Sequence, residues 1–134
     1  MVCYLEPGRK PLTYLDTHVA LWLCTCEVQL SAGALQEIDT GVLRLSPMVL
    51  FELKLLQETG RLNASPEDWL AILQRDFGVI VCTIPFHRVI SASYSEAWTR
   101  DPFDRLIVAN AKVAGGKLIS KDRRIRDHFP DTIW

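Results

Sequence analysis

Four acidic residues stand beside hydrophobic runs, at places where a strand or a helix is expected to begin or end. They are Asp16, Glu52, Asp104 and Asp122. If two follow strands and two lie on helices that lean over the same sheet edge, their side chains meet in one acidic pocket. Carboxylates packed together raise one another's pKa or bind cations that relieve the repulsion. Oxygen ligands without His or Cys suit Mg²⁺ or Mn²⁺, and the chemistry that follows is phosphodiester hydrolysis.

A simpler explanation is open for some of these acids. Asp101 is a good N-cap and Pro102 suits the first helical position, so Asp104 falls in a first turn that favours a carboxylate. Capping alone would therefore explain both acids of this stretch. Glu52 lies in an apolar helical turn, where it has a partner, faces a cleft or is simply exposed beside Lys54. Only the combination of all four acids favours a shared metal site.

The composition is that of an ordinary soluble globular protein. The chain has 134 residues, 49% of them hydrophobic and 23% charged, with a formal net charge of −1. One domain with a real core is expected, without a global positive field for nucleic acid. Basic residues do gather near the C-terminus, where a solvated helix face and an RNA contact both remain open. They are Lys117, Lys121, Arg123, Arg124 and Arg126.

Several function classes lack their sequence signals. No run approaches the roughly 18 apolar residues of a membrane span, and no secretory segment is recognisable, so a cytoplasmic protein is expected. Gly115-Gly116 follows a helix and precedes a strand, which is the wrong order for a phosphate-binding loop. The cysteines lack zinc-finger spacing and are interpreted as reduced, mostly packing thiols. They are Cys3, Cys24, Cys26 and Cys82.

Strands and helices are expected to alternate, which predicts an α/β fold with a mainly parallel sheet. Apolar or β-branched runs predict strands at residues 12–15, 42–45, 79–84, 117–120 and 132–133. The run at 79–84 is continuous, as in a strand covered on both faces. Residues 1–11 are expected to form an irregular arm before a single domain over 12–134. Helices are expected to begin near Thr17, Ser31, Ser46, Ser65, His87 and Asp101.

Four motifs in this order resemble the PIN domain, specifically toxins of the VapC type, over about Leu12 to Trp134. They are Leu15-Asp16-Thr17-His18, the Ser46-Pro47 helix carrying Glu52, Asp101-Pro102-Phe103-Asp104-Arg105, and Ser120-Lys121-Asp122. The resemblance implies a three-layer α/β/α sandwich and a metal-dependent endoribonuclease. In that family the acids matching Asp16, Glu52, Asp104 and Asp122 hold Mg²⁺ or Mn²⁺ and position the attacking water.

The resemblance also implies supporting roles for neighbouring residues. Thr17 and Ser120 match hydroxyl positions that bind a ligating carboxylate or a metal water, and Asp101 is assigned to capping or to the shell behind the ligands. Arg105 either neutralises the acids, touches a phosphate or pairs with Asp101. The basic segment beside Asp122 is expected to guide RNA through Lys121, Arg123 and Arg124.

The partners that the resemblance implies are a small antitoxin, whose C-terminal segment covers the acidic cleft, and a second copy of the chain. Residues 19–23 and 49–56 are candidate surfaces for a homodimer. No recognition module with stacking aromatic residues is evident for the RNA, and Trp98 and Trp134 are assigned to packing.

Two other function classes remain in competition. Another Mg²⁺-dependent phosphoryl transferase with an aspartyl nucleophile would want Asp-x-Asp at the first strand, where this chain has Asp16-Thr17-His18. A non-catalytic binding module on the same fold would be marked by the loss of acids, and none of the four is missing.

Overall fold

The computed structural model describes residues 11–25 and 29–134, in which a five-stranded sheet forms the centre of the fold. Its order is β3-β2-β1-β4-β5, and every neighbouring pair is parallel. This confirms the predicted parallel sheet. The strands are β1 (Leu12–Leu15), β2 (Val42–Leu45), β3 (Ile80–Val81), β4 (Lys117–Ile119) and β5 (Thr132–Ile133).

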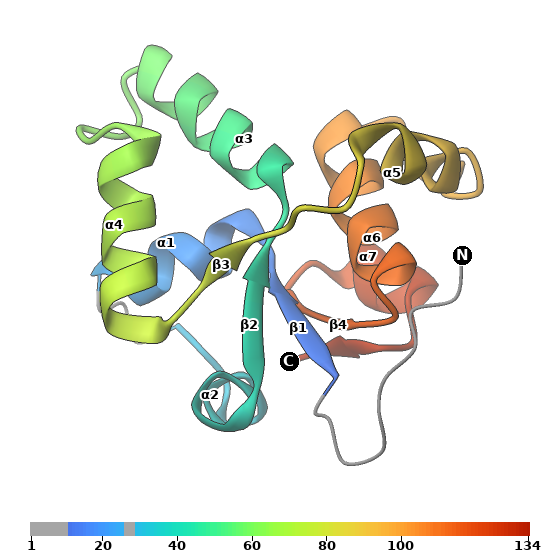
Figure 1. The fold of residues 1–134 in the computed structure, drawn as a ribbon, viewed down its shortest axis with the longest axis horizontal. Coiled ribbons are helices and arrows are strands. Elements are labelled where there is room, and N and C mark those ends of the chain that lie inside the picture. The colour runs from blue at the N-terminus through green and yellow to red at the C-terminus, as the bar shows by residue number, and fades with distance from the viewer. Residues whose placement is uncertain (1–10, 26–28) are drawn as a thin grey trace.

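Helices flank the sheet, with α1, α3 and α4 packed together on one side and α5 and α6 packed together on the other (Figure 1). Helices α3 and α6 also contact each other, so these two groups meet beyond the sheet. The arrangement confirms the predicted α/β sandwich. The helices of the described residues are α1 (Thr17–Thr25), α2 (Ala32–Thr40), α3 (Pro47–Glu58), α4 (Pro66–Phe77), α5 (Phe86–Ser93), α6 (Pro102–Val113) and α7 (Arg123–His128).

Helix starts follow the capping chemistry expected from the sequence. The Ser46 hydroxyl accepts a hydrogen bond from the Met48 amide at the start of α3. Ser65 and Asp68 form a reciprocal capping box at α4, in which the side chain of each residue accepts a hydrogen bond from the amide of the other. Asp101 caps α6. Each cap is followed by proline in the first helical turn, as the sequence analysis expected for Asp101-Pro102.

The core is continuous across the sheet, and it includes several residues of the two segments considered as dimer surfaces. Val19, Leu23, Val49 and Leu53 are buried in it. These four side chains therefore pack inside the protomer and are not exposed for contact with a second copy. Phe51 differs, because it is 53% exposed on α3.

The strand predicted at residues 79–84 is wrong in extent and in environment. Only Ile80–Val81 pair, as the edge strand β3, and Ile80 is 53% exposed. Its neighbour β2 ends at Leu45, whose carbonyl accepts the last bond from the Cys82 amide at 2.8 Å. With no further strand to pair with, the chain leaves the sheet. The helix expected to begin near His87 is α5, which begins at Phe86 and ends at Ser93.

The structure bears in different degrees on the predictions for the N-terminal arm, the cysteines and a membrane-spanning segment. Most of the predicted arm, and both Cys3 and Cys26, lie outside the described residues. Cys24 and Cys82 are half-buried, and the Cys82 sulfur accepts a hydrogen bond from Asn110 Nδ2 at 3.2 Å, in keeping with packing thiols. Among the described helices, none has the length and hydrophobicity to cross a membrane.

Candidate active site

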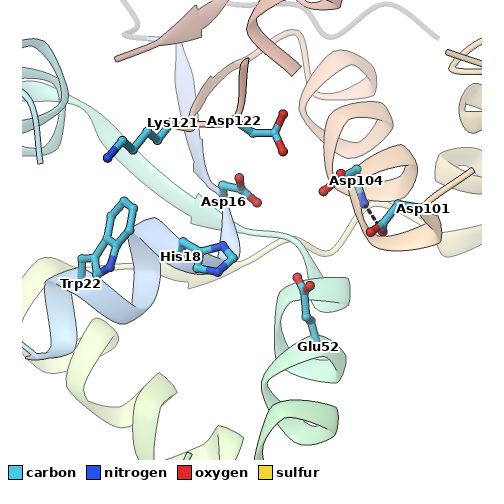
Figure 2. A pocket seen from close by; sticks show the side chains of 8 residues that line it. All are labelled: Asp16, His18, Trp22, Glu52, Asp101, Asp104, Lys121 and Asp122. Carbon is cyan, nitrogen blue, oxygen red and sulfur yellow. Dashed lines mark hydrogen bonds between the residues drawn. The ribbon is translucent and has the colours of Figure 1, made fainter. Parts of the chain in front are cut away.

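The C-terminal edge of the sheet carries an acidic pocket of about 490 Å³. Strands β1 and β4 are parallel neighbours, so the residues that follow them emerge side by side. Asp16 follows β1 and Asp122 follows β4, while Glu52 on α3 and Asp104 on α6 face them across the opening (Figure 2). The four acids predicted to converge therefore do so. The complete lining is Asp16, His18, Trp22, Glu52, Asp101, Asp104, Lys121 and Asp122.

Asp16 is the most enclosed of the four acids and is held on both carboxylate oxygens. The Ser120 hydroxyl donates to Oδ2 at 2.6 Å, and the Thr17 backbone N–H donates to Oδ1 at 2.9 Å. Burial raises the pKa of Asp16, and these two hydrogen bonds oppose the rise. The carboxylate is thus fixed in orientation at the centre of the pocket before any ligand binds.

Glu52 is not the exposed residue that one interpretation of the sequence allowed. It is half-buried, and its Oε1 accepts a hydrogen bond from the Thr17 hydroxyl at 2.5 Å. Burial raises the pKa of Glu52, the Thr17 hydrogen bond lowers it, and the Asp16 charge adds to the rise. The buried Thr17 therefore orients two acids, one through its backbone and one through its side chain.

The pKa of Asp104 is affected by four neighbouring carboxylates as well as by burial. Burial raises the pKa of Asp104 to about 7, with further contributions from the charges of Asp101, Asp16, Asp122 and Glu52 in that order. A group with this pKa is protonated about half the time near neutral pH. Repulsion among the carboxylates is therefore the main electrostatic feature of the pocket after desolvation.

Two acids of the pocket also cap helices. Asp101 Oδ1 accepts hydrogen bonds from the amides of Phe103 at 2.8 Å and Asp104 at 3.1 Å. Asp122 accepts from the Ile125 amide at 3.1 Å and so caps α7. The predicted capping role of Asp101 is confirmed.

The donor set fits a hard divalent cation. It consists of carboxylate oxygens, and a cation would offset the repulsion that raises the pKa of Asp104. Within the described part of the chain, no three His, Cys, Asp or Glu side chains are already gathered as a complete ligand set. Binding an ion through several of these acids would thus require side-chain movement, for which exposed and half-buried acids have room.

The predicted RNA-binding residues lie in different surroundings. Lys121 lines the pocket, whereas Arg105, Arg123 and Arg124 are not in its lining. Arg105 Nη2 donates to the Ser93 carbonyl on α5 at 3.1 Å, and the ion pairs of the described residues do not include one between Arg105 and Asp101. Arg124 donates to the Trp98 carbonyl and lies over its ring. Arg123 is exposed.

His18 and Trp22 are pocket residues that the sequence analysis did not select. They lie four residues apart on α1, which places them on one face of the helix. Their ring centroids are 6.0 Å apart. The spacing was visible in the sequence beside Asp16, but only the packing of α1 shows that this face turns toward the acids.

Comparisons with known proteins find relatives in sequence and in fold. The chain is 35% identical over 126 residues to Ribonuclease VapC22 of Mycobacterium tuberculosis (strain ATCC 25618 / H37Rv), covering 90% of this chain and 96% of that protein. Among solved structures, a toxin-antitoxin complex from Klebsiella pneumoniae gives a TM-score of 0.63 at 13% identity, covering 91% of this chain and 96% of that one. VapBC2 from Rickettsia felis, bound to a DNA fragment from its promoter, gives 0.59 at 15% identity, with 90% and 95% covered.

The two solved structures support the fold alone, at identities this low. The sequence profile of the PIN domain matches residues 13–128, which includes all four acids of the pocket. The chain therefore belongs to the PIN domain family.

Proposed function

We propose that this protein is an endoribonuclease that hydrolyses RNA phosphodiester bonds and serves as the toxin of a toxin–antitoxin pair. The observation that carries the proposal is the meeting of four carboxylates, from two strand ends and two helices, in one open pocket. Family membership and similarity to a named ribonuclease over nearly its whole length support the same activity. All four acids that the resemblance requires are present in this pocket.

The proposed cofactor is Mg²⁺ or Mn²⁺, held by Asp16, Glu52, Asp104 and Asp122. When bound, the ion supplies positive charge that polarises a phosphoryl oxygen and lowers the pKa of water. The chain contributes orientation: Ser120 and Thr17 hold Asp16 in place, and Thr17 also holds Glu52. Such hydrogen bonds to ligand carboxylates commonly tune metal affinity tenfold or more.

RNA is proposed to approach along the basic side of the pocket. Lys121 is exposed at the pocket wall, and Arg123 is exposed in the first turn of α7. Arg124 already donates to the Trp98 carbonyl and lies over the Trp98 ring, so it is less free to bind RNA than Lys121 or Arg123. Arg105 is proposed to anchor α6 to α5 rather than to meet a phosphate.

The remaining assignments also rest on the family. We propose a cognate antitoxin whose segment covers the acidic pocket, where positive side chains would be complementary to the carboxylates. We also propose a homodimer in the cytoplasm, with residues 12–134 as one PIN-like domain and residues 1–11 as an added arm. Exposed Phe51, rather than the buried residues beside it, is the available apolar side chain on α3 for a contact between copies.

The test is cleavage of a pool of structured and single-stranded RNA by purified, antitoxin-free protein. Reactions contain Mg²⁺ or Mn²⁺, with EDTA as one control and a folded Asp16→Asn, Asp104→Asn double variant as the other. We expect cutting that requires metal and disappears in the variant. A folded, metal-loaded protein that leaves every RNA intact, or a variant that cuts equally well, would contradict the proposal.

A further inference from the structure

The pocket has two ends of different chemistry. Asp101 and Asp104 lie at one end, Trp22 and Lys121 lie at the other, and Asp16 lies between them (Figure 2). An indole ring is not a metal ligand, so the carboxylate site does not account for its presence. The end of the pocket with Trp22 and Lys121 therefore needs an explanation other than metal binding.

Trp22 is a half-buried residue whose ring has two aromatic neighbours and is stacked on neither. The His18 ring lies 6.0 Å away at 44°, and the Trp134 ring lies 6.0 Å away at 54°. Both pairs are tilted, so neither neighbour covers an indole face in parallel. Lys121 Nζ lies 6.0 Å from the Trp22 ring centroid. That distance is at the outer limit of a cation–π contact.

We propose that Trp22 is a stacking platform for an unpaired RNA base beside the phosphate that is cut, with the Lys121 ammonium binding a flanking phosphate. This inference rests on the proposed nuclease function. An unpaired nucleotide presents a flat π face and an anion close together, which matches an indole and an ammonium on one pocket wall. Lys121 is exposed, so its side chain is able to move from the ring to a phosphate.

The platform specifies a substrate class. Bases inside a duplex are stacked on one another and do not offer a free face, whereas loops, bulges and ends do. Stacking on an indole accepts every base, because every base has a π face. Trp22 therefore selects single-stranded segments, with little preference for their sequence.

Trp22 also packs against the core, so a test must separate its π face from its volume. Trp22→Leu keeps an apolar side chain without a π face, and Trp22→Phe keeps a smaller π face. Trp69→Phe is the matched control, because Trp69 is another half-buried tryptophan that does not line the pocket. Thermal unfolding and Mn²⁺ titration of each variant establish that the fold and the metal site are unchanged.

The binding probe is a fluorescein-labelled, mixed-sequence single-stranded RNA of 12 nucleotides. It is titrated into each variant in an Asp104→Asn background that does not cut it, and the same RNA as a duplex serves as a second probe. Loss of one base stack corresponds to a rise in Kd of about 5-fold to about 150-fold. We expect that rise for Trp22→Leu with the single strand, a change within about 3-fold for Trp22→Phe, and no change for Trp69→Phe or for the duplex.

A parallel cleavage assay with active protein separates the two proposals. Cutting by the otherwise native protein supports the nuclease, and a rise in KM with little change in kcat for Trp22→Leu supports the platform. Cutting with an unchanged KM and Kd in Trp22→Leu overturns the platform and leaves the nuclease standing. Equal losses in Trp22→Leu and Trp22→Phe also overturn it, because the indole would then act through packing. If no RNA is cut, the nuclease fails and the platform beside a cut phosphate fails with it; the single-strand Kd values then show only whether Trp22 binds an unpaired base.

Discussion

Neutralising one carboxylate of the acidic pocket is expected to stabilise the metal-free protein. Burial and neighbouring charges raise the pKa of Asp104 to about 7 from 3.8 in the unfolded chain. Below about pH 4 this group is protonated in both states. Between about pH 4 and pH 7 the folded protein holds a proton that the unfolded chain has released, so the free energy of unfolding falls as the pH rises. Above pH 7 both states are ionised and the full cost remains.

The size of the effect follows from the same shift. Taken undiminished, the rise in pKa corresponds to about 4 kcal/mol. Asp104 is only half-buried and solvent screens its charge, so we expect about 2 kcal/mol. Asp104→Asn mimics the protonated acid without the titration. In EDTA at pH 8 the variant should therefore be more stable than the native protein by about 2 kcal/mol, and the difference should shrink toward pH 5.

Urea unfolding in EDTA between pH 5 and pH 8, followed by circular dichroism, measures this difference. Asp39→Asn is the matched control, because Asp39 is exposed on α2 and does not line the acidic pocket. Adding Mn²⁺ should reverse the order, since the native protein gains more from the cation than the variant does. An Asp104→Asn protein that is no more stable than the native one at pH 8 would refute the reasoning that burial and neighbouring charges penalise the ionised Asp104 side chain.

Three further substitutions test other contacts of the site. Thr17→Val removes the hydroxyl that donates to Glu52 and should cost about 1.5 to 3 kcal/mol of stability in urea unfolding, while Thr17→Ser retains most of it. Ser120→Ala removes a donor to Asp16 and should weaken Mn²⁺ binding by about 10-fold to 100-fold in calorimetric titration. Arg123→Glu should weaken RNA binding in a salt-dependent way and leave Mn²⁺ affinity unchanged; equal losses of both would contradict its role at the RNA side.

Features with local causes were predictable from the sequence. The caps at Ser46, Ser65 and Asp101 depend on a side chain and amides within three residues, so residue types at fixed spacing were sufficient. The strand at residues 79–84 was mispredicted because β-branched composition does not say whether another strand lies alongside. Its extent was decided by the end of β2 at Leu45, which is distant in sequence.

The pocket residues also divide into those that could be predicted from the sequence and those whose position depends on distant packing. Asp16 and Asp122 could be predicted to lie together, because both follow strands and the carboxyl ends of parallel strands share one edge of the sheet. The place of Trp22 in the pocket could not be predicted, because its orientation depends on how α1 packs against α3 and α4. Sequence spacing placed His18 and Trp22 on one helical face without indicating what that face meets.

Capping and metal binding were competing explanations of the acids, but the structure makes them compatible. Asp101 and Asp122 accept amide hydrogen bonds at helix starts and line the pocket at the same time. The amides offset part of the negative charge gathered there, which lowers the free-energy cost of holding the acids in one pocket. A pocket built only from unpaired acids would be harder to fold, whereas one compensated completely would attract a cation less. In this pocket the negative charge is partly compensated: two acids accept helix amides as caps, and Asp104 has a pKa of about 7.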